Sequence, residues 1–191
     1  MEANELQEAR TNPEFLRFLS EKEENARESK NLKDLYEVLD TMLVLDLDMD
    51  KVDSVYEEIL KNSFEKVEEK LLSGSTLDLT TDEFYAARAM YEHGIEQWSN
   101  QNFGGAKQMF FILNSIISDE ILGNALMVHI INTHNNTSLD SFYTTIAKSE
   151  QSSDDKYGYF ITKFDFDTVQ YLTKNKSVLD EINQQMQSMI M

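Results

Sequence analysis

The sequence predicts an all-α protein built as an array of helical hairpins, and three observations support this fold class. Apolar residues recur at helical spacing along most of the chain. The 191 residues include one proline and six glycines, whereas the turns of β-rich folds use many of both. Residues 90–110 have the pattern of two antiparallel helices that pack closely. Hydrophobic residues make up 41% of the chain, which favours a folded core over disorder.

The predicted hairpin between Met90 and Phe110 is the most informative stretch. Small, large, small and large residues alternate there at Gly94, Trp98, Ala106 and Phe110. These are the offsets of a tetratricopeptide-like repeat, in which small residues let the two backbones approach and aromatic rings fill the space beside them. Such a unit does not bury its apolar face alone, so we expect a neighbouring helical pair on each side and a concave groove.

Capping residues mark the ends of the other helices. Asn12 and Pro13 form a helix start, and Asn31 is a second cap. Gly74 closes a helix, and the segment Thr80–Glu83 resembles a capping box in which a hydroxyl and a carboxylate bond each other's backbone amides. We therefore expect helices over about residues 13–24, 32–43, 54–73, 81–99, 103–117, 118–133, 139–146 and 177–189.

Three regions follow from this pattern. They are an N-terminal helical extension (1–54), a tetratricopeptide-like core (55–150) and a C-terminal helical region (151–191). The apolar stripes of the extension require burial. Self-association as a homodimer, capping of the helical stack and occupation of the groove are all open as its role.

Two stretches are harder to assign. We expect residues 1–12 to be loose and the serine-rich residues 149–156 to form a loop. Residues 157–171 are rich in aromatic residues, and we expect them to be helical, although Phe164-Asp165-Phe166 alternates as in a strand.

The charge of the chain limits its partners. Asp and Glu number 35 against 17 Lys and Arg, which gives a net charge of −18. Such a surface repels nucleic acid and anionic membranes but suits a basic or strongly hydrophobic protein. No segment has the length and apolar character of a membrane span, and the acidic start of the chain does not resemble a secretion signal. We expect a cytoplasmic protein that does not insert into membranes.

No pattern of catalytic residues is found. His129 and His134 are five residues apart, which does not place them on one helical face, and no carboxylate completes a metal site. Gly104-Gly105 is better explained by helix packing than by phosphate binding. The chain has no cysteine and no nucleophile motif. We therefore expect no enzyme, no cofactor and no metal.

One acidic stretch partly matches a calcium loop. Asp46, Asp48, Asp50, Ser54 and Glu57 occupy positions one, three, five, nine and twelve of an EF-hand loop. However, a lysine replaces the glycine of the sharp turn, and an aspartate replaces the apolar residue that faces the core. An acidic turn between helices is the favoured interpretation, with a calcium-responsive helical adaptor as an alternative.

From residue 71 onward the order of features resembles the class II chaperones of bacterial type III secretion, which serve the translocator proteins. The stretch Leu72–Leu77 is similar to the family's glycine turn after a helix, and Thr80–Tyr91 is similar to its polar cap and first repeat helix. Trp98–Phe110 approaches the family's aromatic, alanine and phenylalanine pattern, with Gln101 in place of the usual glycine. The resemblance covers roughly residues 55–135.

This resemblance implies a chaperone of the bacterial cytoplasm. Such a protein binds an extended segment of a hydrophobic secreted partner in its concave groove and keeps the partner soluble before export. The groove residues that it implies are Arg88, Tyr91, Ile95, Leu122, Ala125 and His129. For Tyr91 and Ile95, a place in the helix–helix core is an equally weighted interpretation. A structural or regulatory component of the secretion apparatus and a helical protein injected into a host cell are alternatives.

Overall fold

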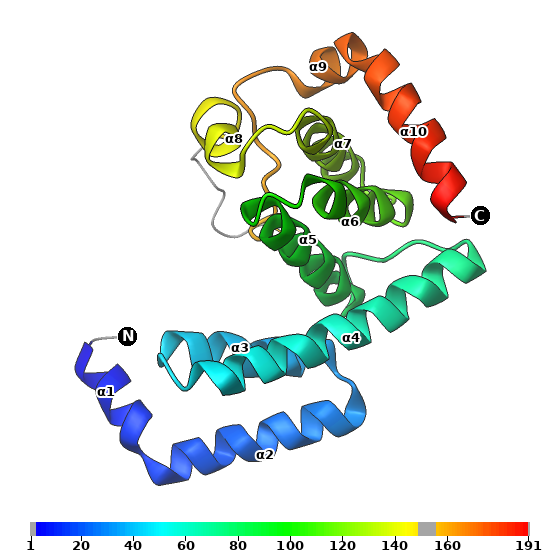
Figure 1. Cartoon of the computed structure of the whole chain (residues 1–191). Helices are drawn as coiled ribbons and strands as arrows, with labels where there is room; N and C mark the ends of the chain where they lie inside the picture. The colour runs from blue at the N-terminus through cyan, green and yellow to red at the C-terminus, as the bar shows by residue number, and fades with distance from the viewer. Residues whose placement is uncertain (1–2, 149–155, 191) are drawn as a thin grey trace. The chain divides into compact units, whose positions relative to one another are not determined.

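The computed structural model describes residues 3–148 and 156–190, and within them the chain forms helices and no strand. The prediction of an all-α array of helical hairpins is confirmed. Contacts divide the chain into two compact units, Met1–Lys66 and Val67–Met191 (Figure 1). The three regions expected from the sequence are divided at other positions, and their boundaries stay predictions.

The first unit contains helices α1 (Ala3–Thr11), α2 (Pro13–Ser29) and α3 (Leu32–Val44) and most of α4 (Met49–Ser73). The side chain of Asn12 accepts hydrogen bonds from the amides of Glu14 and Phe15 at 3.0 and 3.2 Å. Asn31 caps α3 in the same way, through the Asp34 amide at 3.1 Å. Both predicted caps are confirmed.

The expectation that residues 1–12 are loose was wrong, because Ala3–Thr11 form α1. Arg10 lies 3.5 Å from the Asp46 carboxylate, so this helix has a partner in the loop that follows α3. The predicted apolar face of α3 is buried, and α2 packs against it. Its buried residues are Leu35, Tyr36, Val38, Leu39 and Met42.

The second unit is centred on the hairpin of α5 (Glu83–Ser99) and α6 (Phe103–Ser115). Gly94 lies where the two helices cross, since a Cβ atom placed on it would stand 2.6 Å from Cε1 of Phe110. Trp98, Ala106 and Phe110 are all buried. The alternation of small and large residues in the sequence therefore has the predicted structural reason.

A second pair of helices continues the array. Helix α7 (Glu120–His134) packs against α6, and the short α8 (Leu139–Thr145) packs against α5. The indole N–H of Trp98 donates to the carbonyl oxygen of Thr137 at 2.7 Å, in the turn between α7 and α8. This bond ties the first pair to the second.

The link from α4 to α5 agrees with the prediction at one end only. Gly74 ends α4 with φ of 65°, as expected. The predicted capping box was wrong, because the Thr80 hydroxyl donates to the Asp78 carboxylate and the Glu83 carboxylate accepts from the Asp78 amide. Asp78 lies two residues before Thr80, and its carboxylate takes the place of Glu83 as the acceptor for the Thr80 amide. The turn before α5 therefore forms around Asp78.

The C-terminal part contains α9 (Thr168–Lys174) and α10 (Lys176–Ile190), and both contact α7. The prediction of a helix over 157–171 was wrong for its first eleven residues, which are not helical (Figure 1). Most of the predicted loop at 149–156 lies outside the described residues. No helix in residues 3–148 or 156–190 combines the length and apolar character needed to cross a membrane.

Candidate functional site

The six predicted groove residues lie on α5 and α7 but do not form an open surface. Five of them are buried, and Ile95 is half-buried. The buried five are Arg88, Tyr91, Leu122, Ala125 and His129. What covers part of them is a segment of the same chain, residues 157–166, which we call the inserted segment.

Aromatic contacts hold the inserted segment in place. The ring of Phe160 lies with its centroid 5.1 Å from that of Tyr91 and 5.8 Å from that of Phe84. Further along, the Phe164 ring lies 6.1 Å from the rings of both His129 and Phe142. Most of these pairs meet edge to face, the geometry that aromatic quadrupoles favour.

Arg88 completes this surface. Its guanidinium carbon lies 3.8 Å from the ring centroid of Tyr159 on the inserted segment, and its Nε donates to Glu92 at 2.7 Å. A cation over an aromatic face is attracted by the ring electrons. We call the residues that contact the inserted segment the inner face, and they are Phe84, Arg88, Tyr91, His129 and Phe142.

A directed chain of hydrogen bonds crosses the inner face. Nδ1 of His129 lies 2.6 Å from the carbonyl oxygen of Ala125, which only accepts, so this nitrogen carries the proton. Nε2 of His129 therefore accepts from the Tyr91 hydroxyl at 2.9 Å. The Tyr91 oxygen in turn accepts from the Ile161 amide at 3.0 Å. Two helices and the inserted segment share these bonds.

Burial keeps this chain neutral. It lowers the pKa of His129 to about 4 from a usual value of 6.5, even though the bond to Ala125 acts in the opposite direction. Burial also raises the pKa of Tyr91 far above its usual value. A neutral imidazole and a neutral phenol serve here as hydrogen-bond partners and not as an acid and a base.

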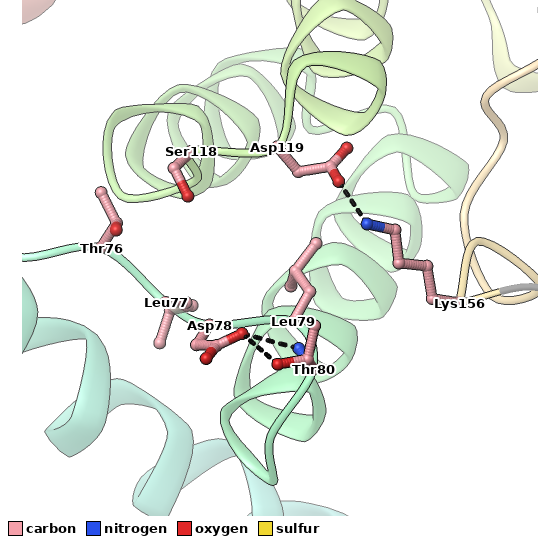
Figure 2. Close-up of a pocket in the computed structure, with 8 residues that line it drawn as sticks. All are labelled: Thr76, Leu77, Asp78, Leu79, Thr80, Ser118, Asp119 and Lys156. Atoms are coloured by element: carbon pink, nitrogen blue, oxygen red, sulfur yellow. Dashed lines mark hydrogen bonds and ion pairs between the residues drawn. The ribbon is translucent and has the colours of Figure 1, made fainter.

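The inserted segment begins at an ionic anchor on the N-terminus of α7 (Figure 2). Asp119 caps this helix by accepting from the Leu122 amide at 2.9 Å. It also binds Lys156 at 2.6 Å and the hydroxyl of Tyr157 at 2.8 Å. Burial acts to raise the pKa of Asp119, but these three hydrogen bonds outweigh it and hold the pKa below its usual value.

This anchor borders a surface hollow of about 480 Å³ (Figure 2). Its other wall is the stretch Thr76–Thr80 before α5. The carboxylate of Asp78 accepts from the Thr80 hydroxyl and amide at 2.7 and 2.9 Å. The two carboxylates in the hollow are thus engaged by neighbouring groups, which suits them to holding the local structure.

The acidic stretch that resembles a calcium loop does not have a loop's geometry. Residues 49–57 form the first turns of α4, so Asp50, Ser54 and Glu57 lie along a helix. Asp48 accepts from the Asp50 amide at 3.0 Å, and Asp46 pairs with Arg10. An EF-hand needs these positions to wrap around the ion. In the described part of the chain no three His, Asp or Glu residues are placed to hold a metal.

The sequence thus identified three residues of the inner face, Arg88, Tyr91 and His129, but not what contacts them. Phe160, Ile161 and Phe164 are the buried residues of the inserted segment, which lies in the aromatic stretch that was expected to be helical. Comparison with protein-family models, curated proteins and solved structures finds no match for this chain.

Proposed function

We propose that this protein is a helical binding module that holds an extended segment of a partner protein on its inner face. One observation carries the proposal: the inner face already holds a non-helical stretch of chain, residues 157–166, through side-chain contacts. A surface that accommodates one non-helical aromatic segment has the chemistry to accommodate another. Aromatic and arginine side chains are also the types that contribute most to protein interfaces.

The partner that fits this surface is hydrophobic and carries basic residues near its bound segment. Apolar and aromatic side chains form most of the inner face, and the net charge of −18 attracts positive charge from a distance. A chaperone that keeps a membrane-inserting protein soluble has such a partner. The sequence resemblance over residues 55–135 supports the narrower proposal of a chaperone for translocators of type III secretion.

The test uses the tagged chain in its source organism, with covalent cross-linking before purification. We expect one membrane-inserting protein that aggregates when produced alone and stays soluble when produced together with this chain. Phe84→Glu alters a half-buried residue of the inner face without placing a charge at Tyr91, which is buried completely enough that a charge there would unfold the protein.

The matched control is Phe18→Glu, because Phe18 is exposed on α2, lies outside the inner face and undergoes the same substitution. We expect Phe84→Glu to reduce recovery of the partner at least tenfold and Phe18→Glu to leave it unchanged. Equal recovery with both variants would count against the inner face as the binding surface. A partner that never dissociates would instead identify a permanent component of an assembly.

A further inference from the structure

The inserted segment is attached to the helices differently from the other elements of the second unit. It forms no helix, and its Phe160, Ile161 and Phe164 are buried while Tyr159, Lys163 and Asp165 are exposed. It therefore contributes three buried apolar side chains to the inner face and leaves several others exposed or half-buried at the surface.

Few backbone hydrogen bonds hold this segment to the helices. The amide of Ile161 donates to the Tyr91 hydroxyl at 3.0 Å. At the other end, the amide of Lys148 donates to the Lys163 carbonyl, and the amide of Asp165 donates to the Ile146 carbonyl, both at 3.0 Å. These last two bonds pair the segment with the residues just after α8. Opening the segment breaks these few bonds and leaves every helix intact.

The ionic anchor of the segment is accessible to solvent. The side chain of Lys156 is 41% exposed, and its partner Asp119 borders the open hollow (Figure 2). Asp119 is 15% exposed, so the pair is open to solvent on the lysine side, and salt weakens it there. Release of the segment from this end returns the Lys156 ammonium group to water, while Asp119 keeps its bond to the Leu122 amide.

We infer that residues 157–166 are an internal ligand of the inner face, and that a partner segment binds by displacing them. This inference rests on the proposed function for the identity of the partner, but the internal ligand exists without one. A partner binds only the molecules whose inserted segment has opened. Its apparent affinity is therefore the intrinsic affinity multiplied by the fraction of open molecules, so the inserted segment sets how tightly a partner binds.

The sequence of the internal ligand predicts the sequence of a partner segment that could replace it. Such a segment is non-helical, carries aromatic residues four positions apart like Phe160 and Phe164, and has an aliphatic residue after the first, like Ile161. A tyrosine before the first aromatic residue would lie over Arg88 as Tyr159 does. A lysine four positions before the first aromatic residue would pair with Asp119 as Lys156 does.

Hydrogen exchange on the wild-type protein tests the internal ligand directly. We expect the Ile161 amide to exchange by local opening, at least tenfold faster than the Phe110 amide in α6 and with little dependence on urea. Lys156→Gln should speed exchange at Ile161 severalfold. Lys163→Gln, an exposed change on the same segment, should not. Exchange of Ile161 only through global unfolding, with the same urea dependence as Phe110, would overturn the inference.

Binding of a labelled peptide with the sequence of residues 156–167 provides the second test. Phe160→Ser in the full chain removes a buried ring of the internal ligand, so we expect this variant to bind the peptide at least tenfold more tightly than wild type. A variant that keeps its helical circular dichroism and binds no peptide would contradict the inference, as would equal binding by wild type. If the variant unfolds, exchange on the wild type decides. Neither test uses the natural partner, so failure to recover a partner from cells is a separate result.

Discussion

Gly94 has no side chain, and this lets α5 and α6 pack closely. A Cβ atom there would stand 2.6 Å from Cε1 of Phe110 and 3.1 Å from two further ring atoms. Phe110 is fully buried and also contacts Tyr91, Trp98 and His129, so its ring has little freedom to move away. The close approach of the two helices therefore depends on the absence of a side chain at this position.

Gly94→Ala is accordingly expected to destabilise the protein by about 1–3 kcal/mol, the usual effect of overpacking a core. Gly104→Ala is the matched control, because a Cβ atom on Gly104 meets nothing within 4 Å. Alanine has a higher helix propensity than glycine, so Gly104→Ala should raise the free energy of unfolding by about 0.5–1 kcal/mol. Urea unfolding followed by circular dichroism measures both. Similar stabilities for the two variants would show that Phe110 yields to the new methyl group.

Residues that act locally were the easiest to predict from the sequence. Asn12, Asn31 and Gly74 have their expected roles because a cap needs only its neighbours in the chain. Gln101 is an instructive departure. It takes φ of 61°, a left-handed conformation that glycine adopts at the least cost, so a non-glycine residue holds the turn between α5 and α6.

At the scale of elements, the bonds around Tyr91 join α5, α7 and the inserted segment. α5 contributes the Tyr91 hydroxyl, the inserted segment contributes the Ile161 amide, and α7 contributes the His129 ring and the Ala125 carbonyl. The bond between the Tyr91 hydroxyl and Nε2 of His129 depends on a neutral imidazole. A proton on Nε2 of His129 would remove the acceptor of the Tyr91 hydroxyl inside a buried environment. The packing of three elements is thereby linked to the protonation of one imidazole.

This linkage predicts a dependence of stability on pH. The pKa of His129 is about 4 in the folded protein and about 6.5 in the unfolded chain, so between these values the unfolded chain holds the proton and the folded protein does not. Lowering the pH from about 6.5 to about 4 should therefore reduce the free energy of unfolding by up to about 3 kcal/mol, at about 1.4 kcal/mol per unit. Above about pH 6.5 the imidazole has no effect.

Urea unfolding of the wild type and His129→Gln at pH 5, 6 and 7 checks this. The other titrating groups are common to both proteins, so only the difference between the two counts. The free energy of unfolding of His129→Gln should depend less steeply on pH than that of the wild type. A proton NMR titration that finds His129 half-protonated near pH 6.5 in the folded protein would refute the expectation.

Elements whose partners are distant in the chain were predicted less well. The inserted segment has the aromatic composition of a core helix, yet its structure depends on residues far away, such as Phe84 and Tyr91. The predicted capping box failed for a related reason, because Glu83 is bound by Asp78 and also by Lys70 at 2.7 Å. Periodicity and caps describe each segment alone, whereas these outcomes depend on competition between partners.

At the scale of the whole molecule, the chain is two compact units, and the sequence did not indicate where they divide. The division lies at Lys66 and Val67, inside α4. A continuous helix has no proline, glycine or change of composition at such a point, so no linker is visible in the sequence. The expected boundary near residue 54 followed the apparent start of that helix, which the structure places at Met49.

Each unit has buried residues of its own, so we expect the two to differ in their resistance to denaturant. Trp98 is the single tryptophan of the chain and is buried in the second unit, so its fluorescence reports on residues 67–191 alone. Circular dichroism reports on the helices of both units. In urea, we expect the two signals of the full chain to change at different midpoints.

A fragment of residues 67–191 should keep the native Trp98 emission and the fluorescence midpoint of the full chain. Coincident transitions, together with an unfolded fragment, would show instead that the two units fold as one cooperative body.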